Sequence, residues 1–240
     1  VQQIIPKIKR RRVTYGMTAQ ADVSATNIRY NAKFGSDFTV LHRGEVLGDI
    51  SMPVPGKHNV YNALAATAVA LELDVPFGKI AEAFSGFSNA NRRFQFKGEV
   101  AGIAVLDDYG HHPTEILATL AAAKNGSGGR RTVVVFQPHR YSRTKELMEE
   151  FALCFNNADV LYVLDIYAAS ETPIEGVTAE TLTDNIRKYG HRNASYLGSI
   201  DNAVEKVLPS LEKGDLVITL GAGTVTRLSD EFLARLAEKK

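Results

Sequence analysis

The pattern of hydrophobic and polar residues is clearest after Arg92 and Arg93, where short apolar segments alternate with longer segments of helical character. Strands are expected near 94–100, 103–107, 132–136, 160–166, 194–197 and 215–220, and helices near 113–124, 144–156, 178–188, 200–209 and 226–238. Runs that are apolar throughout, such as 133–136, are typical of strands covered on both faces. The alternation therefore predicts an α/β fold with a doubly wound, mostly parallel sheet.

The first third of the chain has a more mixed pattern. Residues 1–9 could be the end of a helix, 12–15 and 22–30 alternate like strands, and 37–45 indicates a hairpin. An Ala-rich segment that follows Pro55 and runs to about Leu73 predicts a long helix, and a second helix is expected over 77–84, ending at Gly86. The first fifty residues contain too little apolar mass for an independent core, so they are expected to be the tail of a larger domain. The polar segment 86–91 is then expected to link two domains.

The composition excludes several classes of protein. Of 240 residues, 45% are hydrophobic and 23% are charged, as in ordinary globular proteins. This composition excludes a disordered chain, collagen and a coiled coil. The formal net charge of +1 favours neither nucleic acid nor an anionic membrane surface as a partner, and no apolar run approaches the roughly 20 residues of a membrane helix. The single cysteine, Cys154, cannot form an internal disulfide and indicates a reducing compartment, the cytoplasm. The absence of an initiator Met or a signal segment suggests that the sequence is a fragment.

Polar side chains follow four of the expected strands. Ligands of open parallel sheets bind beyond the carboxyl ends of the strands, and the segments at these positions are 107–113, 137–144, 165–171 and 221–224. Arg140 and Arg143 lie three residues apart at an expected helix start, where positive charge opposes the helix dipole. The pair therefore predicts a bound anion, and a carboxylate fits the guanidinium fork.

Each of these features also has a simpler explanation. His111 and His112 could be one helix-capping and one solvent-exposed histidine, and no third residue at a familiar spacing supports a metal site. The arginines could be surface charges. The turn Gly221-Ala222-Gly223 could bind an anion, but such a short glycine motif more often indicates tight packing.

A second group of polar residues lies at the start of the Ala-rich helix. His58 and Asn62 are four apart and share a face, and Asn59 lies close to it. Imidazole and amide groups above a surface of small Ala side chains can bind the edge of a purine. The alternative is that Asn59 caps the helix.

Three segments resemble motifs of the Mur ligase family of peptidoglycan synthesis: DDYGHHPTE at 107–115, FQPHRYSRT at 136–144 and PGKHN at 55–59. The resemblance covers essentially the whole chain and is greatest to the branch that joins L-alanine to UDP-N-acetylmuramate. It implies that 1–92 are the C-terminal part of the central ATP-binding domain and that 93–240 are the C-terminal, Rossmann-like, amino-acid-binding domain. One departure is large, because the family's phosphate loop is absent: Gly56-Lys57 is followed by His58, and Gly78-Lys79 by Ile80.

The resemblance also implies roles for individual residues. The ATP-binding positions are His58, Asn59, Asn62, Arg93 and Asp108, and the positions that line the L-alanine pocket are Tyr109, His111, His139, Arg140 and Arg143. The implied reaction is ATP-dependent amide formation through an acyl phosphate, with ATP and Mg²⁺ as cofactors. The magnesium ligands and the UDP-sugar domain are expected upstream of this sequence. Alanine's ammonium must lose a proton before it reacts. A histidine that titrates near neutrality suits this task, and His111 is preferred to His139 as this catalytic base.

Three alternatives are also compatible with the sequence. The related ligase that recycles murein tripeptide shares the Mur architecture, although its motifs differ at Tyr109-Gly110 and over 137–143. The chain could also be a non-catalytic module that binds a nucleotide or an amino acid. The last alternative is a metal-dependent hydrolase that uses His111, His112, His139 and Asp108. The isolated chain is expected to bind ligands at most, without turnover.

Overall fold

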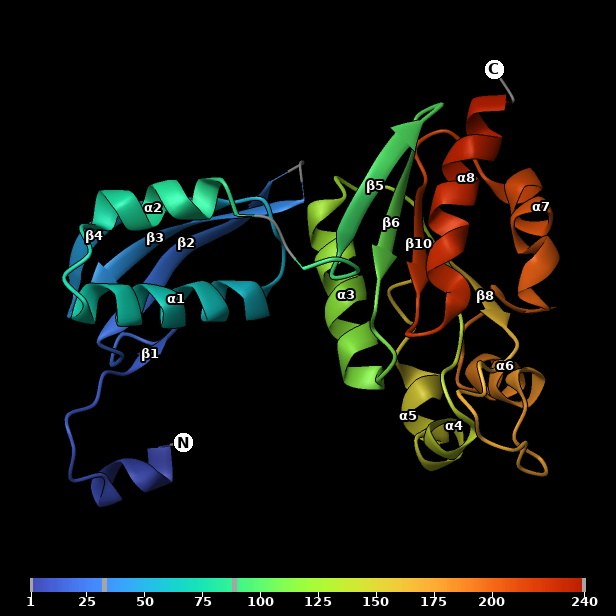
Figure 1. Cartoon of the computed structure of the whole chain (residues 1–240), viewed down its shortest axis with the longest axis horizontal. Helices are drawn as coiled ribbons and strands as arrows, with labels where there is room; N and C mark the ends of the chain where they lie inside the picture. Colours follow the sequence, from blue (N-terminus) through green and yellow to red (C-terminus); the bar gives the residue numbers. More distant parts are fainter. Residues whose placement is uncertain (1, 32–33, 88–89, 239–240) are drawn as a thin grey trace. The chain divides into compact units, whose positions relative to one another are not determined.

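A computed structural model describes residues 2–31, 34–87 and 90–238 of the chain. It divides the chain into two compact units, Val1–Ser88 and Asn89–Lys240, which are drawn in Figure 1. The sequence placed this boundary between residues 92 and 93, four residues further along. Part of the expected link, 86–91, lies outside the described residues.

The first unit contains a four-stranded sheet and two α-helices. Its strands lie in the order β1-β2-β3-β4, with β1 parallel to β2 and the others antiparallel. The expected strand at 22–30 and the hairpin are confirmed. Of the segment 12–15 only Tyr15 belongs to a strand, which is two residues long, and the expected helix end is a 3-10 helix. The elements are η1 (Gln2–Lys7), β1 (Tyr15–Gly16), β2 (Val23–Asn31), β3 (Gly35–His42), β4 (Glu45–Met52), α1 (Lys57–Glu72) and α2 (Phe77–Ser85).

One face of this sheet forms a hydrophobic core with the helices. Alternate residues of β3 and β4, such as Phe38, Val40 and Ile50, are buried together with Val60 and Leu64 of α1. Hydroxyl, amide and charged side chains lie on the opposite face, as expected for an antiparallel sheet with one covered side. The first fifty residues, which were expected to contain too little apolar mass for a core, supply only one half of it. Helices α1 and α2 supply the other half.

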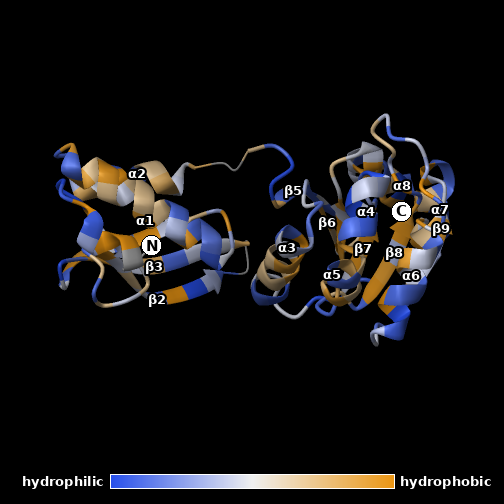
Figure 2. Ribbon diagram, turned by 90° about the horizontal axis from the view of Figure 1, so that it is seen from below, coloured by the Kyte–Doolittle hydropathy of each residue, from blue (hydrophilic) through white to orange (hydrophobic). Residues whose placement is uncertain are grey.

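The second unit contains a six-stranded sheet, in the order β5-β6-β10-β7-β8-β9, in which only β5 is antiparallel to its neighbour. This confirms the predicted α/β fold with a mostly parallel sheet. Figure 2 shows the apolar colouring of β8 in this sheet. The strands are β5 (Gln95–Val100), β6 (Ile103–Asp108), β7 (Thr132–Phe136), β8 (Val160–Leu164), β9 (Ala194–Gly198) and β10 (Leu216–Leu220).

Helices cover both faces of this sheet. Successive residues of each strand point to opposite faces, and the buried strands present apolar side chains on both of them. Val133 and Val135 belong to the core under α7 and α8, whereas the ring of Phe136 contacts Phe151 and Phe155 on the other side. The helical elements are α3 (Pro113–Gly126), α4 (Tyr141–Glu146), α5 (Met148–Leu153), α6 (Ala179–Lys188), η2 (Ile200–Asn202), α7 (Ala203–Val207), η3 (Leu208–Ser210), η4 (Thr224–Thr226) and α8 (Arg227–Glu238).

One helix prediction was wrong in its bounds. The single helix expected over 144–156 is two short helices, α4 and α5, and the first begins at Tyr141. Leu147, with φ −113° and ψ 25°, separates them. The first helix therefore starts directly after Arg140, which is its N-cap residue.

The strand order determines where a site can form. The chain passes from β6 over the position of β10 to β7, continues to β9, and then returns to place β10 between β6 and β7. The connections that leave β6 and β10 therefore cover opposite faces of the sheet, and such a reversal of direction leaves a crevice at the carboxyl ends of the strands.

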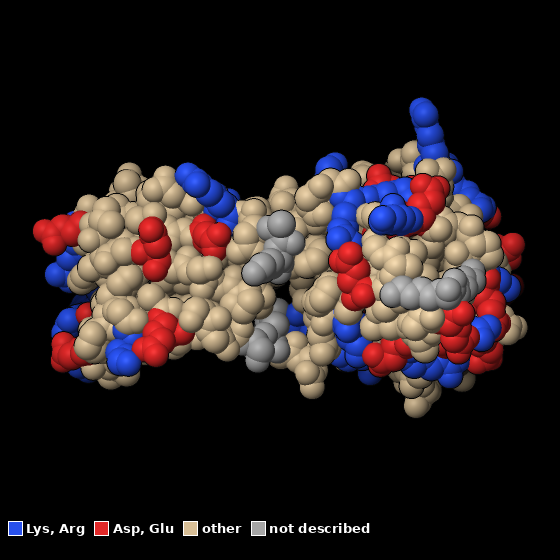
Figure 3. Space-filling model, turned by 90° about the horizontal axis from the view of Figure 1, so that it is seen from above, with Lys and Arg blue, Asp and Glu red and all other residues tan. Residues whose placement is uncertain are grey.

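The surface carries charges of both signs. Figure 3 shows Lys and Arg side chains mixed with Asp and Glu on the face that it presents. Among the described residues, no helix combines the length and the apolar character needed to cross a membrane.

Candidate functional site

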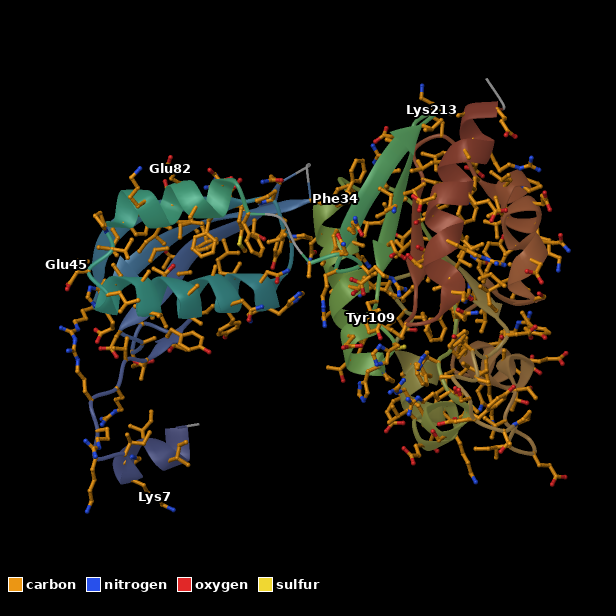
Figure 4. All side chains as sticks on the ribbon, in the orientation of Figure 1. Lys7, Phe34, Glu45, Glu82, Tyr109 and Lys213 are labelled. Atoms are coloured by element: carbon orange, nitrogen blue, oxygen red, sulfur yellow. The ribbon has the colours of Figure 1, made fainter. Side chains whose placement is uncertain are left out.

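The loops that follow β6, β7, β8 and β10 meet at one edge of the second unit's sheet. The parallel register aligns the last residues of these strands, pairing Leu220 with both Asp108 and Phe136. Beyond the strands, an isolated parallel bridge joins His139 to Tyr167. The expectation that these four segments share one edge is thus confirmed. Figure 4 labels Tyr109, in the turn between β6 and α3.

His112 begins helix α3 as its N-cap residue. Its Nδ1 accepts a hydrogen bond from the backbone N–H of Thr114 (3.3 Å), and the carboxylate of Glu115 accepts from the backbone N–H groups of His111 and His112 (3.0 and 3.2 Å). This capping box stabilises the start of the helix. The capping explanation offered for one of the two adjacent histidines is therefore confirmed for His112.

His111 is oriented by the carbonyl group of Tyr109. Its Nδ1 lies 3.1 Å from that oxygen and 3.6 Å from a carboxylate oxygen of Glu115. Because a carbonyl oxygen can only accept, Nδ1 carries the proton, and the lone pair of the neutral imidazole is on Nε2. The rings of His111 and Tyr109 meet edge to face, with centroids 5.2 Å apart.

His139 has the opposite tautomer. Arg143 Nη1 lies 3.1 Å from its Nδ1 and also donates to its carbonyl oxygen (3.2 Å). Since a guanidinium group can only donate, Nδ1 is the acceptor and the proton of the neutral ring is on Nε2. Burial, together with the positive charges of Arg143, His111 and Arg140, lowers the pKa of His139. His139 is thus a neutral ring that orients Arg143 by accepting its hydrogen bond at Nδ1, and its own N–H donor is at Nε2.

These rings form a continuous series of contacts. The centroids of His111 and His139 are 5.8 Å apart, and the ring of Tyr167 stacks on His139 at 5.6 Å with an interplanar angle of 17°. The series brings Tyr109, His111, His139 and Arg143 together. Sequence reasoning did not select Tyr167; the only available signal was an aromatic residue in a segment that follows an apolar strand.

Arg140 occupies the N-cap position of α4 with a left-handed φ of 75°. Its backbone N–H donates to the carbonyl of Tyr167 (2.8 Å), which holds the start of the helix against the loop after β8. Arg140 is exposed, and its charge contributes to lowering the pKa of both His139 and Glu171. In the described part of the chain, no carboxylate lies within 4 Å of this guanidinium group, which leaves it able to bind an external anion.

The sequence did not predict a buried hydrogen-bond network that lies beside this series of rings. Arg92 Nε donates to Asp107 (3.2 Å), and its Nη2 donates to the carbonyl of Gly221. The hydroxyls of Thr219 and Thr226 donate to the two oxygens of Asp107 (2.7 Å each), and Asp107 is only 1% exposed. The sequence offered one signal, a threonine within the otherwise apolar strand β10.

The same arginine supports the Tyr109 turn. The backbone N–H of Tyr109 donates to the carbonyl of Arg92 (2.6 Å), and the guanidinium carbon of Arg92 lies 4.9 Å from the centre of the Tyr109 ring. Arg92 therefore connects the segment before β5 with the loops after β6 and β10.

The two nucleotide positions expected in this unit differ in exposure. Asp108 is 8% exposed, and its oxygens accept from the backbone N–H groups of Phe94 and Gly110 (2.7 Å each). Burial raises its pKa despite these bonds. Arg93 is exposed, and its charge contributes to lowering the pKa of Glu115. In this structure Asp108 fixes two turns, and its role in ATP binding stays a prediction.

The glycine turn after β10 packs tightly. A Cβ atom on Gly221, whose φ is 141°, would lie 2.6 Å from the carbonyl oxygen of Gln137, and one on Gly223 would overlap the side chains of Gln137 and Tyr167. Gln137 in turn accepts from the backbone N–H of Val225 (3.1 Å). Close packing explains the glycines, so the packing explanation is the one that the structure supports.

The expected adenine-binding residues lie in the first turns of α1, in the first unit. His58 and Asn62 are exposed, four residues apart on the helix. Asn59 is not the N-cap, a position that Gly56 occupies; instead its side-chain amide donates to the carbonyl of Pro55 (2.7 Å). The simple capping explanation is therefore wrong, and adenine binding by the three residues stays a prediction.

A metal site finds no support in the described residues, where no group of three or more His, Cys, Asp or Glu side chains is arranged to hold an ion. His112 uses Nδ1 for capping, and the oxygens of Asp108 are bonded to backbone amides. The residues proposed for a hydrolase thus have other structural roles.

Two family models match the chain. The Mur ligase middle domain matches residues 1–70, and the domain described as "Mur ligase, glutamate ligase domain" matches residues 92–223. Together they cover most of both units.

Named relatives agree with these matches. The UDP-N-acetylmuramate–L-alanine ligase of Geobacter sulfurreducens is 52% identical over 240 residues, which are all of this chain and 52% of that protein. The crystal structure of UDP-N-acetylmuramate-alanine ligase from Thermotoga maritima aligns with a TM-score of 0.81 and 26% identity, covering 95% of this chain and 48% of that one. A murein peptide ligase from Psychrobacter arcticus shares the fold, with a TM-score of 0.58, 24% identity, and coverage of 94% and 46%. The chain thus spans about half the length of these relatives.

Proposed function

We propose that this chain, which belongs to the Mur ligase family, provides the amino-acid site and part of the ATP site of a ligase that joins L-alanine to UDP-N-acetylmuramate in peptidoglycan synthesis. The observation that carries the proposal is the series of contacts from Arg143 through His139 and His111 to Tyr109. It places cationic and imidazole groups beside one another at the carboxyl edge of the sheet.

The arginine pair binds the carboxylate of alanine in this proposal. Arg143 is oriented by two contacts to His139, and Arg140 is exposed with no carboxylate partner among the residues that the structure describes. A guanidinium group forms two parallel hydrogen bonds to a carboxylate, which fixes both position and direction. The methyl group and the nitrogen of alanine are then held in a defined orientation.

His111 accepts the proton that alanine must lose before it can react. Its Nδ1–H points at the Tyr109 carbonyl, so the Nε2 lone pair is available, whereas the neutral His139 carries its proton on Nε2. The ammonium gives one proton to His111 Nε2, and the free amine forms the new C–N bond with the activated carboxyl carbon of the sugar. The bond from this carbon to the phosphate oxygen breaks in turn, and the second proton of the nitrogen leaves with the phosphate. Positioning of this kind supplies much of the rate of such reactions.

ATP supplies the activation, by converting the sugar carboxylate into an acyl phosphate that later releases phosphate. The residues of this chain proposed to hold ATP are His58, Asn59 and Asn62 on α1, together with Arg93 and Asp108. The exposed His58 and Asn62 and the exposed Arg93 fit such a role. Among the described residues no group of three or more His, Cys, Asp or Glu side chains is arranged to hold a metal ion, and the magnesium ligands are proposed to lie mainly outside this chain. The site of action is proposed to be the cytoplasm, where the free thiol of Cys154 is compatible with the reducing conditions.

The test is a coupled assay of ADP release with a full-length ligase that contains this chain. We expect turnover that requires both UDP-N-acetylmuramate and L-alanine. Turnover with murein tripeptide in place of L-alanine would identify the recycling ligase instead. The chain of 240 residues alone is expected to give no turnover, and ADP release by it would contradict the proposal that activation depends on groups outside this chain.

A further inference from the structure

Helix α4, which carries Arg143, is only six residues long and has no side-chain cap of its own. The first amide groups of a helix have no partner within the helix. A carboxylate from a different loop fills this role: Glu171 Oε2 accepts from the backbone N–H of Ser142 (3.0 Å), and Oε1 accepts from the Ser142 hydroxyl (2.6 Å). Glu171 follows β8, 29 residues along the chain from Ser142.

The conformation of the loop after β8 places this carboxylate beside the start of α4. Its first part is fixed by the backbone bonds of Tyr167, whose N–H donates to Pro138 and whose carbonyl accepts from Arg140 (2.8 Å each). Ala169 and Ser170 then both adopt left-handed conformations, with φ of 49° and 72°. Two consecutive non-glycine residues in this region are strained, and such strain persists where the surrounding structure imposes it.

The carboxylate of Glu171 forms hydrogen bonds with the start of helix α4 and not with the neighbouring Arg140. The hydrogen bond from the Ser142 hydroxyl is the largest cause that lowers the pKa of Glu171, and Arg140 contributes less. The carboxylate is therefore ionised at neutral pH. Its bonds go to Ser142, and Arg140 forms no ion pair within 4 Å in the part of the chain that the structure describes.

We propose that Glu171 is a positioning residue for the amino-acid site. By capping α4 from outside, it fixes the direction in which Arg143 leaves the helix and the spacing between the two guanidinium groups. It does so without neutralising Arg140, which stays available for the carboxylate of the substrate. This inference rests on the proposed function, and it adds a residue that does not touch the substrate.

The test uses a full-length ligase with the variants Glu171→Ala, Glu171→Gln and Ser142→Ala. We expect Glu171→Ala to raise the KM for L-alanine about tenfold while the KM values for ATP and UDP-N-acetylmuramate change less than about twofold, because misplaced binding groups lose orientation. Glu171→Gln keeps an acceptor for one donor, so its KM for alanine should lie between those of the wild type and Glu171→Ala. Glu175→Gln is the matched control, since Glu175 is an exposed carboxylate of the same loop region, and it should leave every KM unchanged.

The outcomes separate this inference from the proposed function. If the wild type shows no alanine-dependent turnover, the proposed function fails. If Arg143→Ala raises the alanine KM but Glu171→Ala leaves it within twofold, the function stands and the positioning role is wrong. Equal increases in all three KM values would also contradict the role. Should Glu171→Ala not fold, Ser142→Ala, which removes only one donor, decides the question through the same three KM values.

Discussion

Two groups of charged side chains lie at the same edge of the second unit's sheet, and they differ in how far the protein satisfies them. Around Asp107, three side chains from different segments, Arg92, Thr219 and Thr226, all bond to one buried carboxylate. Around Arg140, the guanidinium group is exposed and has no carboxylate within 4 Å among the described residues. Both groups contain an arginine beside imidazole or aromatic rings, so residue type alone does not separate them.

The difference indicates which group serves the fold and which serves a ligand. A saturated, buried network fixes the positions of the loops that it joins, and its loss leaves groups that water cannot reach. An exposed cation next to oriented rings retains its capacity for an external anion. Substitutions in the first group should therefore lower stability, and substitutions in the second should weaken substrate binding.

The largest effect is expected for Asp107→Ala. Removing the carboxylate takes away the acceptor of Arg92 Nε and of the Thr226 hydroxyl, and the shorter of the two bonds of the Thr219 hydroxyl, in a mostly buried place. We expect a loss of about 3 kcal/mol in the free energy of unfolding. Urea denaturation followed by circular dichroism measures this loss. Asp230→Ala, which removes an exposed carboxylate paired with Lys97, is the control. A loss below about 1 kcal/mol would mean that the network is not structural.

His111→Gln should come next, with an effect on catalysis. If His111 takes the proton from alanine, kcat falls by about 10²-fold, the usual loss for a general base. His139→Gln should reduce kcat less, because the Nε2 of His139 carries a proton already. Steady-state rates at saturating alanine compare the two variants. A larger loss for His139→Gln would reverse the assignment.

Arg143→Ala tests the second group directly. We expect the KM for L-alanine to rise at least about tenfold, as for loss of a charge-assisted hydrogen bond, with little change in the KM for ATP. The melting temperature should stay within about 2 °C of the wild type, since the side chain is only partly buried. Arg235→Ala removes a partly exposed arginine on α8 and is the control. Equal changes in the two KM values would exclude the proposed role of Arg143.

The smallest effect is expected from the titration of His139. Its pKa lies below the ordinary value of 6.5, so between these values the unfolded chain binds more protons than the folded one. The stability that this group contributes is thus present above pH 6.5 and is lost as the pH falls through the pKa of the folded state. Histidine signals in an NMR titration should show the low midpoint, and Arg143→Ala should raise it. A midpoint above 6.5 in the wild type would be inconsistent with this environment.

Sequence patterns predicted most of the elements that build the site. The continuous apolar strands, the polar segments after them and the capping role of one histidine follow from local rules that need no knowledge of the fold. The contact of Arg92 with Gly221 could not be foreseen, because it joins residues 129 apart and depends on β10 lying between β6 and β7. Strand order is a property of the whole chain.

The contribution of Glu171 was missed for a similar reason. Its carboxylate caps a helix that belongs to another connection, and a capping rule based on spacing detects only caps within a few residues. The break between α4 and α5 at Leu147 was also missed, since neither Gly nor Pro marks it. Local sequence thus predicted which residues could act, and the tertiary structure determined how they are held.

The most direct measurement compares L-alanine with L-alaninamide, which lacks the carboxylate, in a full-length ligase and its Arg143→Ala variant. If two guanidinium groups at the sheet edge hold that carboxylate, the wild type should prefer alanine in kcat/KM by at least about a hundredfold, and the variant should lose about tenfold or more of this preference. If the preference is the same in both proteins, the arginine does not bind the carboxylate and the account of this site is wrong.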